Sequence, residues 1–417
     1  MSKVVFFGFP GHGHTNPTLG VVKELIRRGE EIIYFSAPEY QPQITRAGAV
    51  FRKYQFSLFQ KNRLEKKLDP NTLNQVGKEA FYRMKLYFDI IENKRQDLKK
   101  LLAKMKPDYI IHDSCANWGK FLAKTLGIPA ICSMTTFAYC ERVLETHPEF
   151  VLRKILRTPD HYLVDPRDSR KVIQRLTQML GNLFGIAGYD FFDLAYSLEP
   201  LNIVYTSKEF QFFNELFDPS FKFVGPSLEF RDDSRGLPRK LSGKRLIYIS
   251  LGTVDNLNPA YPDFYRKCFA AFGNLSHQVV MAVRNANIRK LGKIPDNFTV
   301  CRSVPQLEIL KQADLFVTHG GMNSANEALY FNVPMIVVPQ RVDQFQVAWR
   351  VANLGAGIAM KNMEFTAREL QEAATEVLTN KSYREQCKII GASLKAAGGH
   401  TRAADEIFQF KIKQGIQ

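Results

Sequence analysis

Short runs of β-forming, apolar residues alternate with segments of helical periodicity along most of this chain. The first run, Val4 to Phe9, leads through a loop of glycine and histidine into a segment whose apolar residues recur at helical spacing. Comparable runs are Glu31 to Ser36, Tyr109 to His112 and Ala130 to Met134. Strands that are apolar throughout and separated by helices belong to parallel sheets covered by helices. The pattern therefore predicts a doubly wound α/β fold.

The same alternation starts again in the second half of the chain. Residues 225–240, GPSLEFRDDSRGLPRK, separate the halves, and their proline, glycine and charged residues are typical of an exposed linker. Four buried strands are expected beyond them: Leu246 to Ser250, Gln278 to Val283, Leu315 to Thr318 and Met335 to Val338.

The length of the chain also indicates more than one domain. It has 417 residues, and single cores stop growing near roughly 250 to 300 residues. We therefore predict two Rossmann-like domains, over residues 1–228 and 241–397. A linker over residues 229–240 joins them, and a last helix follows over residues 398–417. Two such domains leave a central cleft that their parallel sheets face, and ligands of parallel sheets bind outside the carboxyl ends of the strands.

Three residues predict the ends of the first helix. Asn16 suits the N-cap, Pro17 suits the first helical position, and Gly29 suits the left-handed residue that follows the last turn. On this interpretation His14 lies in the loop before the helix.

Composition excludes several classes of protein. Hydrophobic residues at 45% and charged residues at 24% are typical of soluble globular chains. The formal net charge of +16 would suit nucleic acid, but lysine and arginine are scattered, so solubility is the favoured explanation. The six cysteines form no CxxC pair, and no run reaches the roughly 18 apolar residues that span a bilayer. We expect a cytoplasmic protein without stable membrane insertion.

The segment THGGMNSANEAL, residues 318–329, places two glycines between a buried strand and a helix. Amides at a helix N-terminus can hold a diphosphate, and the imidazole of His319 can donate a hydrogen bond to a phosphate oxygen. A plain glycine turn in which Ser324 and Glu327 form a capping box is the structural alternative.

Four motifs together resemble the UDP-glycosyltransferase superfamily: GHGHTNP at 11–17, VPQLEIL at 304–310, THGGMNSANEAL at 318–329 and VPQRVDQ at 338–344. The chain is most similar to the bacterial macrolide-glycosyltransferase-like branch, which includes broad-acceptor UDP-glucosyltransferases of the Bacillus type. The resemblance implies the GT-B fold, with the acceptor on the N-terminal domain, the nucleotide sugar on the C-terminal domain and inversion at the anomeric carbon. It also implies that the last helix crosses back to the N-terminal domain.

By this resemblance His14 is the general base that takes the proton of the acceptor hydroxyl. Asp113 directly follows a predicted strand, so it should stand at the cleft edge beside His14 and hold the imidazole in one tautomer. A plain turn residue before Ser114 is the alternative for Asp113.

A bound metal ion is not expected. His12 and His14 form an HxH pair, but no third ligand stands near them in the sequence, and Asp232 with Asp233 falls in the linker instead of forming a strand-flanked DxD. The protein itself must then meet the charge of the leaving diphosphate. The candidates for this task are Thr253, His319, Gly321, Asn323 and Ser324.

The resemblance implies further contacts to the donor. Glu327 would take the ribose hydroxyls, Val304 and Gln306 would flank the base and ribose, and Asp343 with Gln344 would hold the sugar, although helix capping also explains these last residues. Ser303 stands where many relatives carry tryptophan, so the usual aromatic platform under uracil is absent. UDP-glucose is the expected donor substrate, with dTDP or another UDP sugar as the alternative, and no cofactor is expected.

The acceptor is expected to be a small, largely apolar molecule such as a flavonoid or macrolide. Aromatic residues are frequent in the N-terminal half, and aromatic clefts suit flat or macrocyclic ligands. The candidate acceptor contacts are Phe81, Phe88 and Phe137. We expect no nucleic-acid partner, and a monomer or weak dimer.

Three other functions compete with transfer. A nucleotide-sugar-binding module without turnover would not need His14 and Asp113 as a pair. A dinucleotide oxidoreductase is weakly suggested by GFPGHG at 8–13, whose glycine order is GxxGxG instead of GxGxxG. An RNA-binding function rests on the net charge alone.

Overall fold

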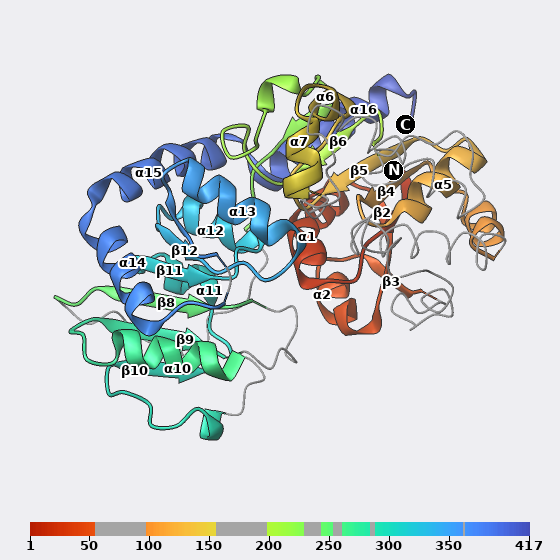
Figure 1. Cartoon of the computed structure of the whole chain (residues 1–417). Coiled ribbons are helices and arrows are strands. Elements are labelled where there is room, and N and C mark those ends of the chain that lie inside the picture. The colour runs from red at the N-terminus through yellow and green to blue at the C-terminus, as the bar shows by residue number, and fades with distance from the viewer. Residues whose placement is uncertain (55–96, 156–197, 229–242, 253–260, 284–287, 362) are drawn as a thin grey trace, which may run out of the picture. The chain divides into compact units, whose positions relative to one another are not determined.

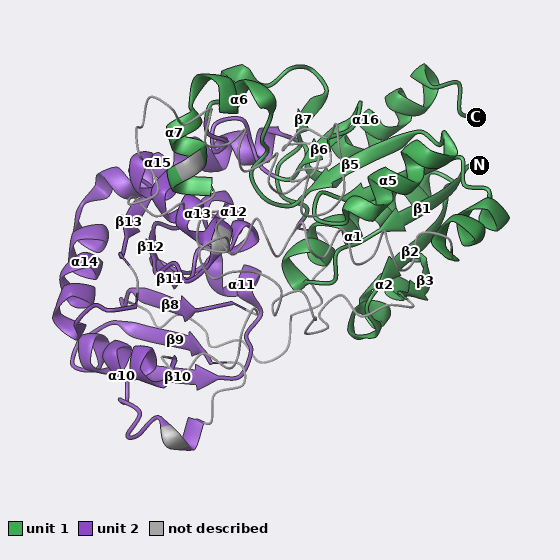
Figure 2. Cartoon of the chain, turned by 45° about the vertical axis from the view of Figure 1, so that its right-hand side comes forward, with its two compact units in different colours: residues 1–205, 213–227, 398–417 green, residues 206–212, 228–397 purple. Residues whose placement is uncertain are grey.

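The computed structural model describes residues 1–54, 97–155, 198–228, 243–252, 261–283, 288–361 and 363–417 (Figure 1). The chain divides into two compact units, which Figure 2 draws in different colours. Unit 1 comprises residues 1–205, 213–227 and 398–417, and unit 2 comprises residues 206–212 and 228–397. Each unit is built around one parallel β-sheet, which confirms the predicted doubly wound α/β class.

The sheet of unit 1 has the order β3-β2-β1-β4-β5-β6-β7 in the described residues, and every neighbouring pair is parallel. Its strands are β1 (Lys3–Phe7), β2 (Glu31–Ser36), β3 (Val50–Lys53), β4 (Tyr109–Asp113), β5 (Ala130–Met134), β6 (Asn202–Val204) and β7 (Phe221–Phe223). All residues of β4 and β5 are buried, because helices cover both faces of the sheet.

All but the last of the described helices of unit 1 lie between these strands along the chain. The helices are α1 (His12–Arg27), α2 (Gln41–Arg46), α5 (Asn117–Leu126), α6 (Glu141–Thr146), α7 (Pro148–Phe150) and α16 (Gly399–Lys413). The C-terminal helix α16 packs on α1. The ammonium group of Lys411 on α16 forms a buried ion pair with Glu30, and Arg28 pairs with Asp405 at 2.7 Å. These contacts make the last twenty residues part of unit 1.

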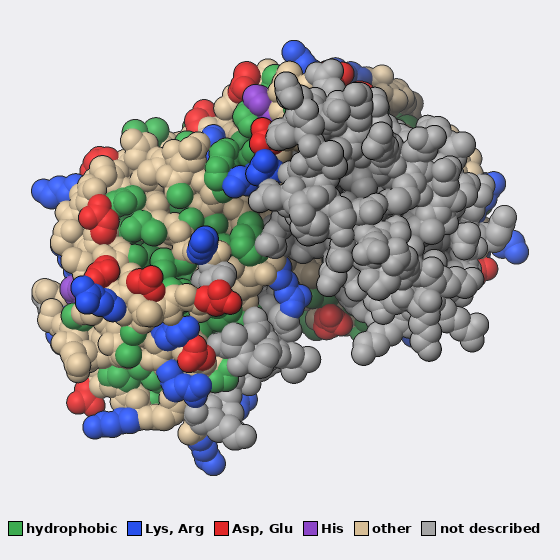
Figure 3. Space-filling model, viewed as in Figure 1, with side chains coloured by type: hydrophobic (Ala, Val, Ile, Leu, Met, Phe, Trp, Pro, Cys, Tyr) green, Lys and Arg blue, Asp and Glu red, His purple; other side chains and the backbone are tan. Residues whose placement is uncertain are grey.

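The sheet of unit 2 has the order β10-β9-β8-β11-β12-β13. Its strands are β8 (Leu246–Ser250), β9 (Gln278–Ala282), β10 (Phe298–Cys301), β11 (Leu315–Thr318), β12 (Met335–Val337) and β13 (Gly357–Ala359). The helices are α10 (Tyr261–Phe272), α11 (Gln306–Leu310), α12 (Met322–Tyr330), α13 (Val342–Asn353), α14 (Ala367–Thr379) and α15 (Lys381–Ala396). Figure 3 shows that basic and acidic side chains are interspersed on the drawn face of this unit.

The start of α1 differs from the prediction. Gly11 is the N-cap, because its carbonyl accepts hydrogen bonds from the amides of His14 and Thr15, at 3.0 and 2.8 Å. Asn16 therefore does not cap the helix, and Pro17 lies inside it instead of at its first position. The proline removes one amide, which would otherwise bond to the carbonyl of Gly13. His14 consequently lies in the first helical turn and not in a loop.

Both sheets reverse their strand order at their centre. The order changes between β1 and β4 in unit 1 and between β8 and β11 in unit 2. Ligands of doubly wound sheets bind beyond the carboxyl ends of the strands at such a switch point. In the described part of the chain, no helix is long and apolar enough to cross a membrane.

Candidate functional site

The switch point of unit 1 brings together residues from three strand ends. His14 follows β1, Asp113 is the last residue of β4, and Thr135 directly follows β5. The Nδ1 atom of His14 lies 2.9 Å from Asp113 Oδ2 and 2.9 Å from Thr135 Oγ1. The side chain of Asp113 is 1% exposed and that of His14 is 21% exposed. The carboxylate is thus buried behind an imidazole that reaches solvent.

This geometry selects one tautomer of His14. An ionised carboxylate can only accept hydrogen bonds, so the Nδ1 atom that faces Asp113 must carry the proton. The Nε2 atom then keeps its lone pair and can accept a proton from another molecule. The imidazole also lies against the ring of Phe9, with ring centroids 4.9 Å apart. The arrangement is that of an oriented general base.

Asp113 also has the turn role that the sequence left open. Its Oδ1 atom accepts the backbone amide of Cys115 at 2.7 Å, while Oδ2 faces His14. The two oxygens therefore fix the loop after β4 and the imidazole together.

The sequence offered no third ligand for the His12 and His14 pair, but the fold brings two other potential metal ligands close to His14. The ligand atoms of His14, Asp113 and Cys115 all lie within 4.8 Å of one another. Sequence spacing could not reveal this group, because Asp113 and Cys115 come from β4 and the loop that follows it. His12, the other member of the HxH motif, instead packs edge-on against the ring of Tyr40.

The switch point of unit 2 is built around His319, which follows β11. A Cβ atom added to Gly252 would lie 2.3 Å from its Cε1 atom, and one added to Gly321 would lie 2.6 Å from its Nε2 atom. Gly252 also has φ of +75°, a conformation that glycine adopts readily. The imidazole therefore fits between two backbone segments that only glycine allows to approach so closely.

Burial lowers the pKa of His319 from 6.5 to about 4. The side chain is 6% exposed, and no carboxylate is among the causes of the shift. His319 is therefore neutral at physiological pH and offers one N–H donor. It stands directly before α12, whose N-cap is Gly321 and whose first turn carries no acidic residue. This combination suits an anionic group.

Three predicted donor residues meet beside this helix. The side-chain Nε2 atom of Gln306 donates to Glu327 Oε2 at 2.6 Å and to Ser324 Oγ at 3.3 Å. The hydroxyl of Tyr248 on β8 donates to the side-chain oxygen Oε1 of Gln306 at 3.1 Å. The capping-box alternative for Ser324 and Glu327 is wrong, because α12 begins at Met322 and both residues lie inside it.

Gln344 caps its own helix. Its Oε1 atom accepts the amides of Gln340 and Arg341 at 2.9 and 3.1 Å, so any ligand contact would fall to its amide nitrogen. Asp343 lies in the first turn of α13. Three further predicted donor residues are partly exposed: Asn323 at the start of α12, Val304 before α11 and Asp343 on α13.

Some predicted residues are not brought to either switch point by the described structure. Phe137 is 1% exposed, so its ring has almost no surface to offer an acceptor. Thr253, Phe81 and Phe88 lie outside the described residues.

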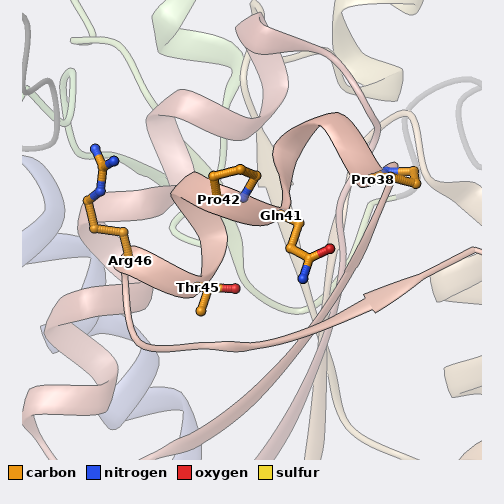
Figure 4. A pocket seen from close by; sticks show the side chains of 5 residues that line it. All are labelled: Pro38, Gln41, Pro42, Thr45 and Arg46. Carbon is orange, nitrogen blue, oxygen red and sulfur yellow. The ribbon is translucent and has the colours of Figure 1, made fainter.

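A hollow of about 450 Å³ lies over α2 and the preceding turn (Figure 4). It is lined by Pro38, Gln41, Pro42, Thr45 and Arg46, and it is open to solvent. None of these side chains belongs to the two switch points, so this hollow is not a candidate for the reaction.

The sequence interpretation missed Thr135, Cys115, Tyr248 and the part played by Gly252. Thr135 carried a usable signal, since it directly follows a correctly predicted strand, as Asp113 ends one. The approach of Gly252 to His319 had no local signal, because it depends on β8 and β11 being neighbours in the sheet.

Comparison with known proteins identifies the family. Residues 266–405 match the family described as Erythromycin biosynthesis protein CIII-like, C-terminal domain. The chain is 36% identical to the uncharacterized UDP-glucosyltransferase YojK of Bacillus subtilis (strain 168), over 100% of this chain and 99% of that protein. It is 30% identical to the oleandomycin glycosyltransferase of Streptomyces antibioticus, over 97% of this chain and 90% of that protein.

Solved structures agree with this assignment. The crystal structure of CalG4, the calicheamicin glycosyltransferase, matches with a TM-score of 0.79 and 26% identity, over 99% of this chain and 98% of that one. The chain therefore belongs to the UDP-glycosyltransferase superfamily, in its macrolide-glycosyltransferase-like branch, and is a glycosyltransferase with the GT-B fold.

Proposed function

We propose that this enzyme transfers glucose from UDP-glucose to a hydroxyl group of a small, largely apolar acceptor, with inversion and without a metal ion. The observation that carries the proposal is the 2.9 Å contact between His14 Nδ1 and Asp113 Oδ2 at the switch point of unit 1. A module that only bound a nucleotide sugar would have no use for an imidazole oriented in this way.

His14 would act as the general base. Its Nε2 atom accepts the proton of the acceptor hydroxyl while that oxygen forms a bond to the anomeric carbon of the sugar. The bond from the anomeric carbon to the β-phosphate oxygen breaks, and UDP leaves. Attack opposite the leaving group inverts the anomeric carbon. Asp113 stabilises the imidazolium that forms, since its carboxylate already accepts the Nδ1 proton.

The residues around His319 would hold the diphosphate. The neutral imidazole of His319 and the amides at the start of α12, near Gly321 and Asn323, donate to phosphate oxygens and so stabilise the developing charge. Thr253 would add a hydroxyl. Glu327 would take the ribose hydroxyls, with Gln306 and Val304 beside the base and ribose. Asp343 and Gln344 would contact the sugar.

The names of relatives support glucose as the sugar and natural products as acceptors. YojK is named as a UDP-glucosyltransferase, and the 30% identical relative is named as an oleandomycin glycosyltransferase. Ser303 is exposed and offers no aromatic surface, so dTDP sugars are the second candidate donors. A flavonoid, a macrolide or a similar hydroxylated molecule is the proposed acceptor.

The proposal extends to organisation and location. Residues 1–228 would bind the acceptor and residues 241–397 the nucleotide sugar, with the helix over 398–417 returning to the acceptor domain. None of the six cysteines, all of which are described, forms a disulfide. This supports the proposed cytoplasmic location, since reducing compartments keep thiols reduced. A monomer or weak dimer without nucleic-acid partners is proposed as well.

Mass spectrometry tests the function directly. The purified enzyme is incubated with EDTA, UDP-glucose and a pool of flavonoids and macrolides, beside a His14→Ala control. A hexose added to an acceptor by the wild type, and absent from the control, is the expected result. Transfer from dTDP-glucose alone would overturn the UDP assignment. Binding of UDP without transfer from any nucleotide sugar would favour the binding module.

A further inference from the structure

His14 and Asp113, which the proposed transfer reaction uses, form a second kind of site together with Cys115, which that reaction does not use. His14, Asp113 and Cys115 supply one nitrogen, one oxygen and one sulfur atom, all within 4.8 Å of one another. The loop that carries the thiol is fixed, because the amide of Cys115 donates to Asp113 Oδ1 at 2.7 Å and the amide of Ala116 donates to the Asp113 carbonyl at 2.8 Å.

The chemistry of these atoms matches a borderline-soft transition metal. Thiolate and imidazole favour Zn²⁺ and Co²⁺, whereas Mg²⁺ and Ca²⁺ prefer sites made of oxygen. Zinc lies about 2.0 to 2.3 Å from nitrogen, oxygen and sulfur ligands, so tetrahedral ligand atoms are roughly 3.5 Å apart. The largest separation therefore needs to close by at most about 1.3 Å, while the 2.9 Å between His14 Nδ1 and Asp113 Oδ2 needs to open slightly. Rotation of the partly exposed His14 and Cys115 side chains can supply both changes.

We propose that His14, Asp113 and Cys115 bind Zn²⁺ and that the bound ion switches off His14 as a base. The three side chains occupy three positions of a tetrahedral site, and water takes the fourth.

Proton positions explain why binding would block transfer. The metal takes the Nδ1 lone pair of His14, so the Nδ1 proton moves to Nε2, and the thiol proton of Cys115 is released to solvent. A neutral imidazole with its proton on Nε2 cannot accept the proton of an acceptor hydroxyl. Inhibition should therefore lower kcat and leave the affinity for UDP unchanged, because the donor residues belong to unit 2.

Cobalt spectroscopy tests the site without any turnover. Titration of the wild-type enzyme with Co²⁺ should produce a thiolate-to-cobalt charge-transfer band and the visible bands of tetrahedral cobalt. Cys115→Ser should lose the charge-transfer band. Cys301→Ser is the matched control, since Cys301 is also half-buried but belongs to unit 2, and it should keep the band. A wild type without the band, or Cys115→Ser with the full band, would overturn the proposal.

The activity test rests on the proposed transfer reaction, whereas the cobalt titration needs no turnover. A protein that shows the cobalt band but no transfer in EDTA would contradict the proposed function and not the metal site. Each variant is titrated with Zn²⁺ and compared with its own rate in EDTA. We expect the half-inhibiting concentration to rise about tenfold or more in Cys115→Ser and in Cys115→Ala. Mg²⁺ should not inhibit any of the proteins. Equal zinc sensitivity of wild type and both Cys115 variants would refute inhibition through this site.

Discussion

Each unit places a histidine at the switch point of its sheet, after β1 in unit 1 and after β11 in unit 2, and the two histidines have opposite properties. His14 and His319 each lie beyond the central strands of a parallel sheet, at the point where strand order reverses. His14 is 21% exposed and contacts a carboxylate at 2.9 Å. His319 is enclosed between two glycines, and its pKa is lowered to about 4 by burial.

The difference shows that the neighbours of each histidine, and not the fold, set its chemistry. A buried carboxylate favours the charged imidazolium, as a base requires after it has taken a proton. An enclosed site without a carboxylate favours the neutral imidazole, which donates a hydrogen bond but takes up no proton near pH 7.

Asp113→Asn should have the largest effect. The asparagine oxygen can still accept the amide of Cys115, and this places its NH₂ group toward His14 Nδ1. That group donates, so the imidazole proton moves to Nε2 and the base is lost. We expect kcat to fall about a hundredfold or more, with a small change in UDP affinity. Steady-state kinetics measure kcat, and calorimetry measures the affinity for UDP. An equal loss of kcat and of UDP affinity would contradict the assignment of Asp113 as the partner of the base.

His319 should give unit 2 a pH-dependent stability. Its pKa is about 4 in the folded state and 6.5 unfolded, so the unfolded chain binds a proton that the folded chain excludes. The contribution of His319 to the free energy of unfolding is fully present above pH 6.5 and is lost as the pH drops toward 4. The loss is at most about 3 kcal/mol, at ~1.36 kcal/mol per pKa unit.

Urea unfolding at pH 7 and pH 4.5 measures this loss. Trp349 lies in unit 2, so its fluorescence in a Trp118→Phe background reports that unit. His319→Gln in the same background should be less sensitive to pH. An identical pH dependence in both proteins would show that His319 is not the group responsible.

Gly252→Ala should disturb His319 without touching His14. The new methyl group would overlap the imidazole, so the ring must move. We expect UDP affinity to fall about tenfold, the value of one hydrogen bond to a charged group. Gly243→Ala is the control, because Gly243 has φ of +74° and, apart from its chain neighbours, no atom of the described residues lies within 4 Å of the added Cβ. If both variants lose the same affinity, backbone strain and not the histidine explains the effect.

Thr135→Val should have the smallest effect of the series. It removes the hydroxyl that lies 2.9 Å from His14 Nδ1 and keeps a similar volume. A neutral hydrogen bond of about 0.5 to 1.5 kcal/mol corresponds to a fall in kcat of roughly two- to tenfold. Thr136→Val, the neighbouring control, should retain the wild-type rate. A larger fall than in Asp113→Asn would mean that Thr135, and not the carboxylate, orients the base.

Most of the central, buried strands could be predicted from the sequence, but the edge strands could not, and neither could β6, which is buried but only three residues long. β2, β5, β8 and β11 begin and end where their apolar runs do. β3 escaped prediction because it is a sheet-edge strand with two basic residues and Val50 47% exposed. β13 has only three residues, which is too short for a periodic signal. Edge strands lack the double-sided burial that makes a strand recognisable.

The residues of the candidate site also divide into those that could be predicted from the sequence and those that could not. Asp113 and His319 were found because each stands near the end of a recognisable strand, whereas His14 was found through the resemblance of its motif to a known family. Cys115 and Gly252 act through contacts between segments far apart in the sequence, and no spacing rule records such contacts. The early start of α1 was missed because Pro17 suggested a helix start that the structure places at His12.

Calorimetric titration of UDP into His14→Ala and His319→Ala tests the central contrast most directly. We expect wild-type affinity for His14→Ala and an affinity lowered about tenfold or more for His319→Ala. Loss of UDP affinity in His14→Ala, or its full retention in His319→Ala, would contradict the division of a base in unit 1 and a neutral donor in unit 2.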